Sequence, residues 1–422
     1  MTRNPFQKFP TYTQKFQTHH HYPVCFTTDL FAGDNQTIRQ TLTQMGHDHP
    51  TRCAVFIDSG VVARNRTLIK QITRYFQKEH PFFDLCHPPF VLSGGESVKN
   101  NRRLLDEILS ITHTHHLTPD GLVFLVGGGA FLDAAGSALA QCRGGIRAAN
   151  IPTSTLSQCA AGIGTLRFMN ACGIKNFSAI AAPPYAVFID FSLLKTLPFE
   201  HHLSGMAEAF KMALATDAEF FSVLVKKARK IHQNDPATVE KVVYKTALLH
   251  LEKIQASSDP FSESTTGPSG LGCRVAHWLE TRSGDKLTHG HALSVGVALN
   301  ACYAHCTESL AEEEFSRFIH AMLTCGLPVW NRFLETRTEI GELELKNELI
   351  QYQENPLSNH PLMVPEGIGA LKPVPRIDFD VLEKSVVMLR QLARKAPSEE
   401  RRLFIVKPGK RAENNERRRE MR

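Results

Sequence analysis

The sequence contains no run of about 18 apolar residues, the length that marks a candidate membrane-spanning helix. Its first 23 residues are polar and rich in His, Gln and Thr, so they lack the apolar core of a secretory signal. Its 10 cysteines show no repeated short spacing, which argues against a disulfide scaffold and favours a reducing compartment. These absences predict a cytoplasmic protein with no membrane span.

A large excess of one charge is also missing from most of the chain. The net charge is +6, and much of the excess lies in residues 401–422. No nucleic-acid-binding motif and no interleaved aromatic residues accompany this charge, so we interpret residues 396–422 as a solvated, disordered basic tail. We therefore expect a small-molecule ligand and no nucleic-acid partner.

The strict Gly-x-Gly-x-x-Gly fingerprint of dinucleotide-binding proteins is absent, but a related segment is present. An apolar run at residues 121–125 is typical of a buried parallel strand, and a small-residue helix is expected through about Gln141. The three glycines Gly127, Gly128 and Gly129 stand between them. Glycines at such a junction let a ligand approach the backbone, and the helix start can bind a pyrophosphate. A glycine turn without a ligand is the alternative.

The first half of the chain alternates between strand and helix patterns. We expect strands near residues 53–57, 90–92, 146–151 and 186–190, and helices over residues 62–77 and 101–113. This alternation predicts an α/β fold, a Rossmann-like doubly wound domain whose ligands bind at the carboxyl ends of the strands. Asp58 and the pair Gly94 and Gly95 follow expected strands and so belong to that edge.

After Pro198 the helical period takes over, and we expect an all-helical second domain. Ser204 is expected to cap a helix that carries Glu208 and Lys211 on one face, three residues apart. The predicted division is an N-terminal extension with the first strand (1–50), an α/β domain (51–197), a helical domain (198–395) and the tail (396–422).

Side chains that bind metals gather in the helical half. Cys273 and His277 are four residues apart, so one helix face can present both. Glu208, His289 and His291 are further candidates. Glu, Cys and His all ligate zinc, and three protein ligands with one open position are typical of a catalytic site. The spacing alone also leaves a purely structural role open for each residue.

Several segments in one order give a more specific signal. They are Gly94-Gly95-Glu96 with Lys99, Gly127-Gly128-Gly129 with Asp133, Arg143-Gly144-Gly145-Ile146, residues 151–156, Lys175-Asn176, Thr196-Leu197-Pro198, Gly205-Met206-Ala207-Glu208 with Lys211, and His289-Gly290-His291-Ala292. Over roughly residues 53–306 this order resembles the 3-dehydroquinate synthase family of sugar-phosphate cyclases. Residues 258–261 and 276–280 resemble the divergent branch found in Ebo-type gene clusters.

The resemblance implies NAD and a divalent metal, zinc or cobalt, in a cleft between the two domains of a homodimer. It implies a carbon–oxygen lyase that oxidises a ring hydroxyl with NAD, eliminates phosphate from a sugar or sugar-acid phosphate, reduces the ketone again and closes the ring by an aldol step. By position, NAD contacts fall on Asp58, Glu96, Lys99, Gly127, Gly128, Gly129, Asp133, Thr153, Ser154 and Lys175. Catalytic and substrate contacts fall on His277, Lys211, Arg143 and Asn176, and the metal ligands on Glu208, Cys273 and His289.

The sequence departs from the family pattern in the substrate half. Three charged family residues are replaced by Ala160, Leu166 and Gly267, and a metal-binding histidine by Cys273. Arg167, next to Leu166, is a candidate replacement for the missing lysine charge. These changes indicate either a substrate other than the ordinary dehydroquinate precursor or a lost activity.

Two other functions remain open from the sequence. One is a catalytically degenerate relative that binds NAD and serves as a binding subunit. The other is a metal-dependent polyol or alcohol dehydrogenase, which shares the two-domain plan.

Overall fold

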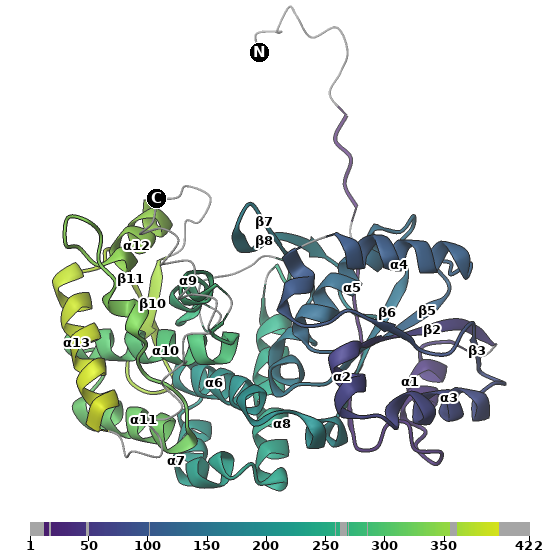
Figure 1. Ribbon diagram of the computed structural model, residues 1–422, viewed down its shortest axis with the longest axis horizontal. Helices are drawn as coiled ribbons and strands as arrows, with labels where there is room; N and C mark the ends of the chain where they lie inside the picture. The colour runs from purple at the N-terminus through teal and green to yellow at the C-terminus, as the bar shows by residue number, and fades with distance from the viewer. Residues whose placement is uncertain are drawn as a thin grey trace, which may run out of the picture.

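The computed structural model describes residues 12–16, 18–47, 50–100, 102–257, 259–261, 268, 270–284, 286–354 and 361–395. A half built on a sheet, purple to blue in Figure 1, is followed by a helical half, teal to yellow. The predicted basic tail, residues 396–422, lies outside these ranges. Within them, no helix combines the length and apolarity that crossing a membrane requires.

A parallel sheet forms the centre of the N-terminal half. Its strands are β1 (Val24–Thr27), β2 (Thr51–Asp58), β3 (Phe83–Leu85), β4 (Phe90–Leu92), β5 (Leu122–Gly127), β6 (Arg147–Pro152) and β9 (Ala186–Asp190). They follow the order β1-β9-β6-β5-β2-β3, with β4 also paired to β2, and every one of these pairs is parallel. Parallel strands end at a common edge, so Asp58, Gly127 and Pro152 lie at one side of the sheet.

Helices cover both faces of this sheet, which confirms the doubly wound α/β prediction. One buried apolar cluster joins the sheet to α1 (Thr37–Gln44) and α3 (Leu68–Lys78). A second joins it to α4 (Arg103–Thr114) and α5 (Gly129–Gln141). The two groups of helices lie on opposite sides of the sheet in Figure 1.

The expected single helix over residues 62–77 is wrong. The chain forms α2 (Ser59–Arg64) and α3 instead, separated at residues 65–67. Asn65 leaves the helical conformation, and its side-chain oxygen accepts a hydrogen bond from Thr67 Oγ1 at 3.0 Å. Local side-chain hydrogen bonds of this kind compete with helix continuation.

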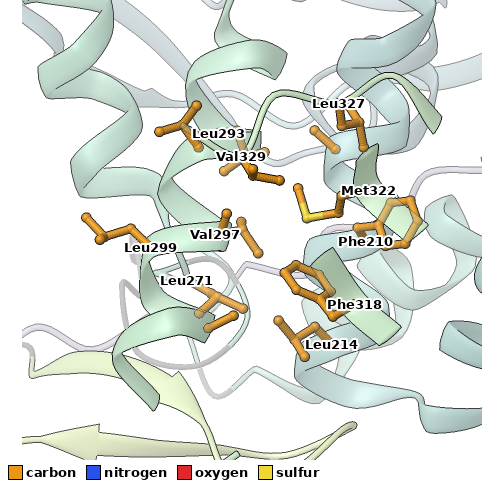
Figure 2. Packing of buried hydrophobic residues seen from close by; sticks show 14 of the residues in the cluster. Phe210, Leu214, Leu271, Leu293, Val297, Leu299, Phe318, Met322, Leu327 and Val329 are labelled. Carbon is orange, nitrogen blue, oxygen red and sulfur yellow. The ribbon is translucent and has the colours of Figure 1, made fainter. Parts of the chain in front are cut away.

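The C-terminal half is helical, as predicted. It contains α6 (Phe199–Thr216), α7 (Ala218–His232), α8 (Pro236–Ala256), α9 (Cys273–Ser283), α10 (His289–Cys306), α11 (Glu312–Cys325), α12 (Glu344–Glu354) and α13 (Phe379–Lys395). Figure 2 shows Phe210 of α6 near Phe318 and Met322 of α11, with Val297 of α10 in the same cluster. The structure adds one short antiparallel hairpin, β10 (Leu362–Pro365) with β11 (Leu371–Val374), to the expected helices.

The prediction that Ser204 caps α6 is wrong. The helix begins at Phe199, directly after Pro198, and Ser204 is buried in its second turn. A Cβ on Gly290 of α10 would lie 2.1 Å from Ser204 Cα, so the two helices touch backbone to backbone here. Ser204 therefore serves as a small residue at a helix crossing.

A second hairpin, β7 (Leu166–Ala171) with β8 (Ile174–Ala181), extends from the sheet half toward α9 (Figure 1). Its β8 strand packs against α9. This hairpin is what brings predicted site residues of the N-terminal half, Lys175 and Asn176, to the helical half.

Candidate active site

The carboxyl edge of the sheet gathers the predicted nucleotide residues. Asp58 ends β2 and caps α2 by accepting a hydrogen bond from the Gly60 N–H at 2.7 Å. A Cβ on Gly94 would lie 1.9 Å from Asp58 Oδ1, so the loop after β4 passes directly over this carboxylate. Burial raises the pKa of Asp58. Residue 94 must be glycine because any side chain at this position would collide with Asp58.

The three glycines between β5 and α5 play different parts. A Cβ on Gly127 would lie 2.5 Å from the Phe131 ring, and one on Gly129 would lie 2.8 Å from Ala161 Cβ. A Cβ on Gly128 would meet no atom within 4 Å. Packing therefore explains the first and third glycines. The second faces open space at the start of α5, whose first N–H groups have no partner within the helix and can bind phosphate.

Residues after β6 complete this edge. The Thr153 N–H donates to the Gly127 carbonyl at 3.0 Å, and the Ser154 and Ser157 hydroxyls lie 2.9 Å apart. Buried Thr155 donates to the His201 carbonyl at 2.8 Å and accepts from the Gly205 N–H at 3.1 Å. Thr155 thus fixes the start of α6 beside the predicted nucleotide site.

Lys99, Asp133 and Asn176 form one network, in which Lys99 and Asp133 are buried and Asn176 is half-buried. Lys99 Nζ lies 3.0 Å from Asp133 Oδ2 and 2.6 Å from Asn176 Oδ1. Asn176 has a left-handed backbone with φ of 54°, a conformation that asparagine tolerates better than most residues. The network brings together two predicted NAD contacts and one predicted substrate contact.

Two predicted arginines do not join the site. Arg167 is 1% exposed and points into the interior, where its Nε donates to the Ala182 carbonyl at 3.1 Å. The idea that Arg167 replaces the charge missing at Leu166 is therefore wrong. Arg143 is exposed in the connection between α5 and β6, at the amino edge of the parallel sheet. The 13 residues of α5, about 1.5 Å each, separate it from the predicted nucleotide edge of its own chain.

Glu208 on α6 is the centre of a first cluster in the helical half. Lys211 Nζ lies 2.6 Å from Glu208 Oε1 and 3.9 Å from Cys273 Sγ, and His250 Nε2 of α8 lies 2.7 Å from the same Oε1. Although burial opposes ionisation, Lys211 and His250 lower the pKa of Glu208. Burial also opposes the charge of Lys211, yet Cys273 and Glu208 raise its pKa. Glu208 is thus a buried carboxylate held beside an ammonium group.

His289, the first residue of α10, belongs to a second cluster. Its Nδ1 lies 2.8 Å from Glu280 Oε1 of α9. His277, Glu280 and His289 offer metal-binding atoms that all lie within 4.8 Å of one another. Burial and Lys175 lower the pKa of His289 to about 4, and burial and His289 hold the pKa of His277 well below its usual range. Both imidazoles are therefore neutral at pH 7 and chemically competent to bind a metal.

The predicted ligand set and the compact cluster share only His289. Among the described residues, the one group of three whose metal-binding atoms meet that spacing is His277, Glu280 and His289. Glu208 and Cys273 both contact the Lys211 ammonium, at 2.6 and 3.9 Å. The assignment of Glu208, Cys273 and His289 to the metal stays a prediction.

Sequence reasoning missed three residues of this site. Glu280 follows His277 by three residues, and this spacing predicts that the two side chains share one face of the helix. His250 and Lys253 lie on α8 and carried no sequence signal. Burial and Lys211 lower the pKa of Lys253 to about 8, with Glu208 and Cys273 acting in the opposite direction. Lys253 therefore belongs electrostatically to the same cluster as Lys211.

Two family models match adjacent segments of this chain. The one described as 3-dehydroquinate synthase N-terminal matches residues 89–204, and the one described as 3-dehydroquinate synthase C-terminal matches residues 205–345. Together they span more than half of the 422 residues. The chain is also 28% identical over 303 residues to the 3-dehydroquinate synthase of Pyrobaculum islandicum, an alignment that covers 71% of this chain and 84% of that protein.

Solved structures share the fold. The 2-epi-5-epi-valiolone synthase of Streptomyces hygroscopicus subsp. jinggangensis 5008, with NAD+ and Zn2+ bound, superposes with a TM-score of 0.77 at 23% identity, covering 90% of this chain and 99% of that one. A 2-deoxy-scyllo-inosose synthase complexed with carbaglucose-6-phosphate, NAD+ and Co2+ gives a TM-score of 0.65 at 18% identity, covering 86% and 96%. At these identities the likeness establishes the fold.

Proposed function

The chain belongs to the 3-dehydroquinate synthase family of sugar-phosphate cyclases, and on that premise we propose that it is an NAD- and divalent-metal-dependent cyclase. Its substrate is a phosphorylated sugar or sugar acid, and the reaction eliminates phosphate. We further propose that the enzyme works as a cytoplasmic homodimer. The observation that carries the proposal is that α10 packs against both α6 and α9, the helices that carry the Glu208 and His289 clusters, while β8 of the nucleotide half packs against α9.

The residues of this chain fit both NAD and a divalent metal. The open space at Gly128, in front of the free N–H groups of α5, suits the pyrophosphate of NAD. For the metal, Glu208 supplies a buried carboxylate, Cys273 a thiol and His289 an imidazole, all of which ligate zinc. Because His289 Nδ1 contacts Glu280, its Nε2 is the nitrogen left for a metal. Bound NAD supplies the hydride acceptor, and a bound divalent ion lowers the pKa of a coordinated hydroxyl.

The chain's own side chains have separate tasks in this proposal. Lys211 and Lys253 hold the phosphate and carboxylate groups of the substrate through charge-assisted hydrogen bonds. Asn176 orients the ring from the β8 side, where Lys99 fixes its amide at 2.6 Å. Neutral His277 accepts a proton beside the reacting carbon. Arg143, which lies at the other edge of its own sheet, contacts no substrate within the same chain.

The substrate differs from the ordinary dehydroquinate precursor in this proposal. Ala160 and Leu166 stand where the family pattern has charges, and Arg167 is turned into the interior. Gly267, the third such position, lies outside the described residues. A site with fewer charged contacts suits a ligand with fewer anionic groups.

A test separates the cyclase from its rivals. Purified protein loaded with NAD and zinc is incubated with a panel of phosphorylated sugars and sugar acids, and inorganic phosphate and NADH are followed together. Phosphate release without net NADH is the result expected of the cyclase. Net NADH indicates a polyol or alcohol dehydrogenase. NAD binding with neither product indicates the catalytically degenerate relative, the alternative that the missing charges favour.

A further inference from the structure

We propose that Glu280 is a positioning residue that orients His289 toward the metal, and that Lys175 holds Glu280 in place from the nucleotide half. The inference rests on the proposed function, because it concerns the metal that His289 would bind. Nothing in the family resemblance assigned a role to Glu280, and it assigned Lys175 to NAD.

The contact between Glu280 and His289 defines the ring orientation. Glu280 Oε1 and His289 Nδ1 are 2.8 Å apart, and the carboxylate can only accept, so Nδ1 carries the proton. The Nε2 lone pair is then free to bind a cation. Metal-ligating histidines almost always donate their second ring N–H to a carboxylate, a carbonyl or water, and this partner fixes the tautomer and raises the basicity of the ligand.

Glu280 is deeply buried and forms an ion pair with Lys175. Its side chain is 2% exposed, and an ionised carboxylate at such a position needs a paired cation. Lys175 of β8, itself 8% exposed, supplies that ion pair. The ammonium group therefore stabilises the anion that His289 needs as its acceptor.

Lys175 also reaches the nucleotide edge of the sheet. Its Nζ lies 3.1 Å from Glu96 Oε1, and Glu96 begins the short helix that follows Gly94 and Gly95. Glu96, Lys175, Glu280 and His289 thus form a continuous chain of contacts from one half of the molecule to the other. The geometry of the metal ligand depends on a residue 105 positions away from Glu280 in sequence.

The test measures metal affinity in the full-length protein. Metal is removed with a chelator, and Zn2+ is titrated against a chromophoric competitor in the wild type, Glu280→Gln and Lys175→Met. We expect Glu280→Gln to bind Zn2+ about 10 to 100 times more weakly, the usual cost of losing such a partner. Lys175→Met should weaken binding as well, although it touches no proposed ligand. Glu344→Gln is the control. Glu344 of α12 pairs at 2.8 Å with Arg282, which lies on α9 like Glu280, so this variant removes an ion pair to α9 that does not include His289.

A second readout separates positioning from general damage. The NAD affinity and the melting temperature of Glu280→Gln should stay close to those of the wild type. In the Co2+-loaded protein the visible ligand-field bands should change in Glu280→Gln and remain as in the wild type in Glu344→Gln. If Glu280→Gln does not fold, the Zn2+ affinity and the Co2+ spectrum of Lys175→Met, which keeps Glu280, are compared with those of the wild type instead.

Several results would overturn the inference. Wild-type Zn2+ affinity in both variants removes the positioning role. Loss of metal in Glu280→Gln together with full metal binding in Cys273→Ser makes Glu280 a direct ligand of the compact cluster instead. A wild-type protein that takes up no metal overturns the proposed function and this inference together, whereas a metal-binding wild type with unaffected variants overturns the inference alone.

Discussion

At the residue scale, Gly128 is a position where a side chain can disturb ligand binding without disturbing the packing of the protein. A Cβ at this position meets no protein atom within 4 Å, and the backbone has φ of −75°, which any residue adopts. Gly128→Val should therefore fold normally but lose NAD affinity by about 10 to 100 times, because its side chain occupies the space proposed for the pyrophosphate. Calorimetric titration with NAD checks this. Equal affinity in the variant and the wild type would show that NAD binds elsewhere.

The proposed metal ligands make a second prediction at this scale. Glu208→Gln and Cys273→Ser should each lose bound metal, because each removes an anionic donor from a site with three protein ligands. Elemental analysis of the purified proteins measures the stoichiometry. Cys306→Ser is the control, since Cys306 lies at the far end of α10 from His289. Full metal content in both variants would favour the compact cluster of His277, Glu280 and His289.

The lowered pKa of Lys253 predicts that the affinity for an anionic substrate depends on pH. Its pKa of about 8 is lowered by burial and by Lys211, so the ammonium that would hold an anionic substrate is lost as the pH rises through 8. Affinity for a phosphorylated substrate should fall between pH 7 and pH 9. Lys253→Met should bind about 10 to 100 times more weakly at pH 7, the cost of a charged hydrogen bond.

Binding curves measured from pH 6.5 to 9.5 for the wild type, Lys253→Met and Lys226→Met test this dependence. Lys226 is exposed on α7 and should leave the curve unchanged. A pH profile that persists in Lys253→Met would assign the effect to another group.

At the element scale, the crossing of α6 and α10 sets the distance between the two clusters. The crossing depends on Gly290, whose added Cβ would lie 2.1 Å from Ser204 Cα. Gly290→Ala should lower the free energy of unfolding by about 1–3 kcal/mol, as overpacking does, and should weaken metal binding because Glu208 and His289 are moved apart. Denaturant unfolding and zinc titration measure the two effects. Gly128→Ala is the matched control, and equal stability of both variants would contradict the prediction.

Element positions were largely predictable because they depend on local periodicity. The apolar runs placed β2, β5, β6 and β9 within a few residues of their observed bounds. The two failures, the break between α2 and α3 and the start of α6, both arose at helix ends. Single side-chain hydrogen bonds and the position of Pro198 decide where these helices begin and end, and the apolar pattern carries little information about helix ends.

At the scale of the whole molecule, the missing charges predict how the enzyme treats the ordinary dehydroquinate precursor. Each lost contact to a phosphate or carboxylate costs about 2–5 kcal/mol by analogy with truncated charge pairs, although such losses are not additive. Buried Arg167 offers no compensation. We therefore expect little or no phosphate release from that precursor. A turnover number of about 1–10³ per second, ordinary for enzymes, would show that other residues bind the charges.

The sequence by itself determined the fold class, the glycine junction and the family, because these depend on local periodicity and on short motifs in a fixed order. It also placed Glu208 and Lys211 on one helix face, which a three-residue spacing settles. Only the tertiary structure decided that Arg167 points inward, that Arg143 lies at the other edge of the sheet, and that Lys175 pairs with Glu280. The direction of a side chain and its partners across 105 residues depend on how the two halves pack, and no local pattern encodes that packing.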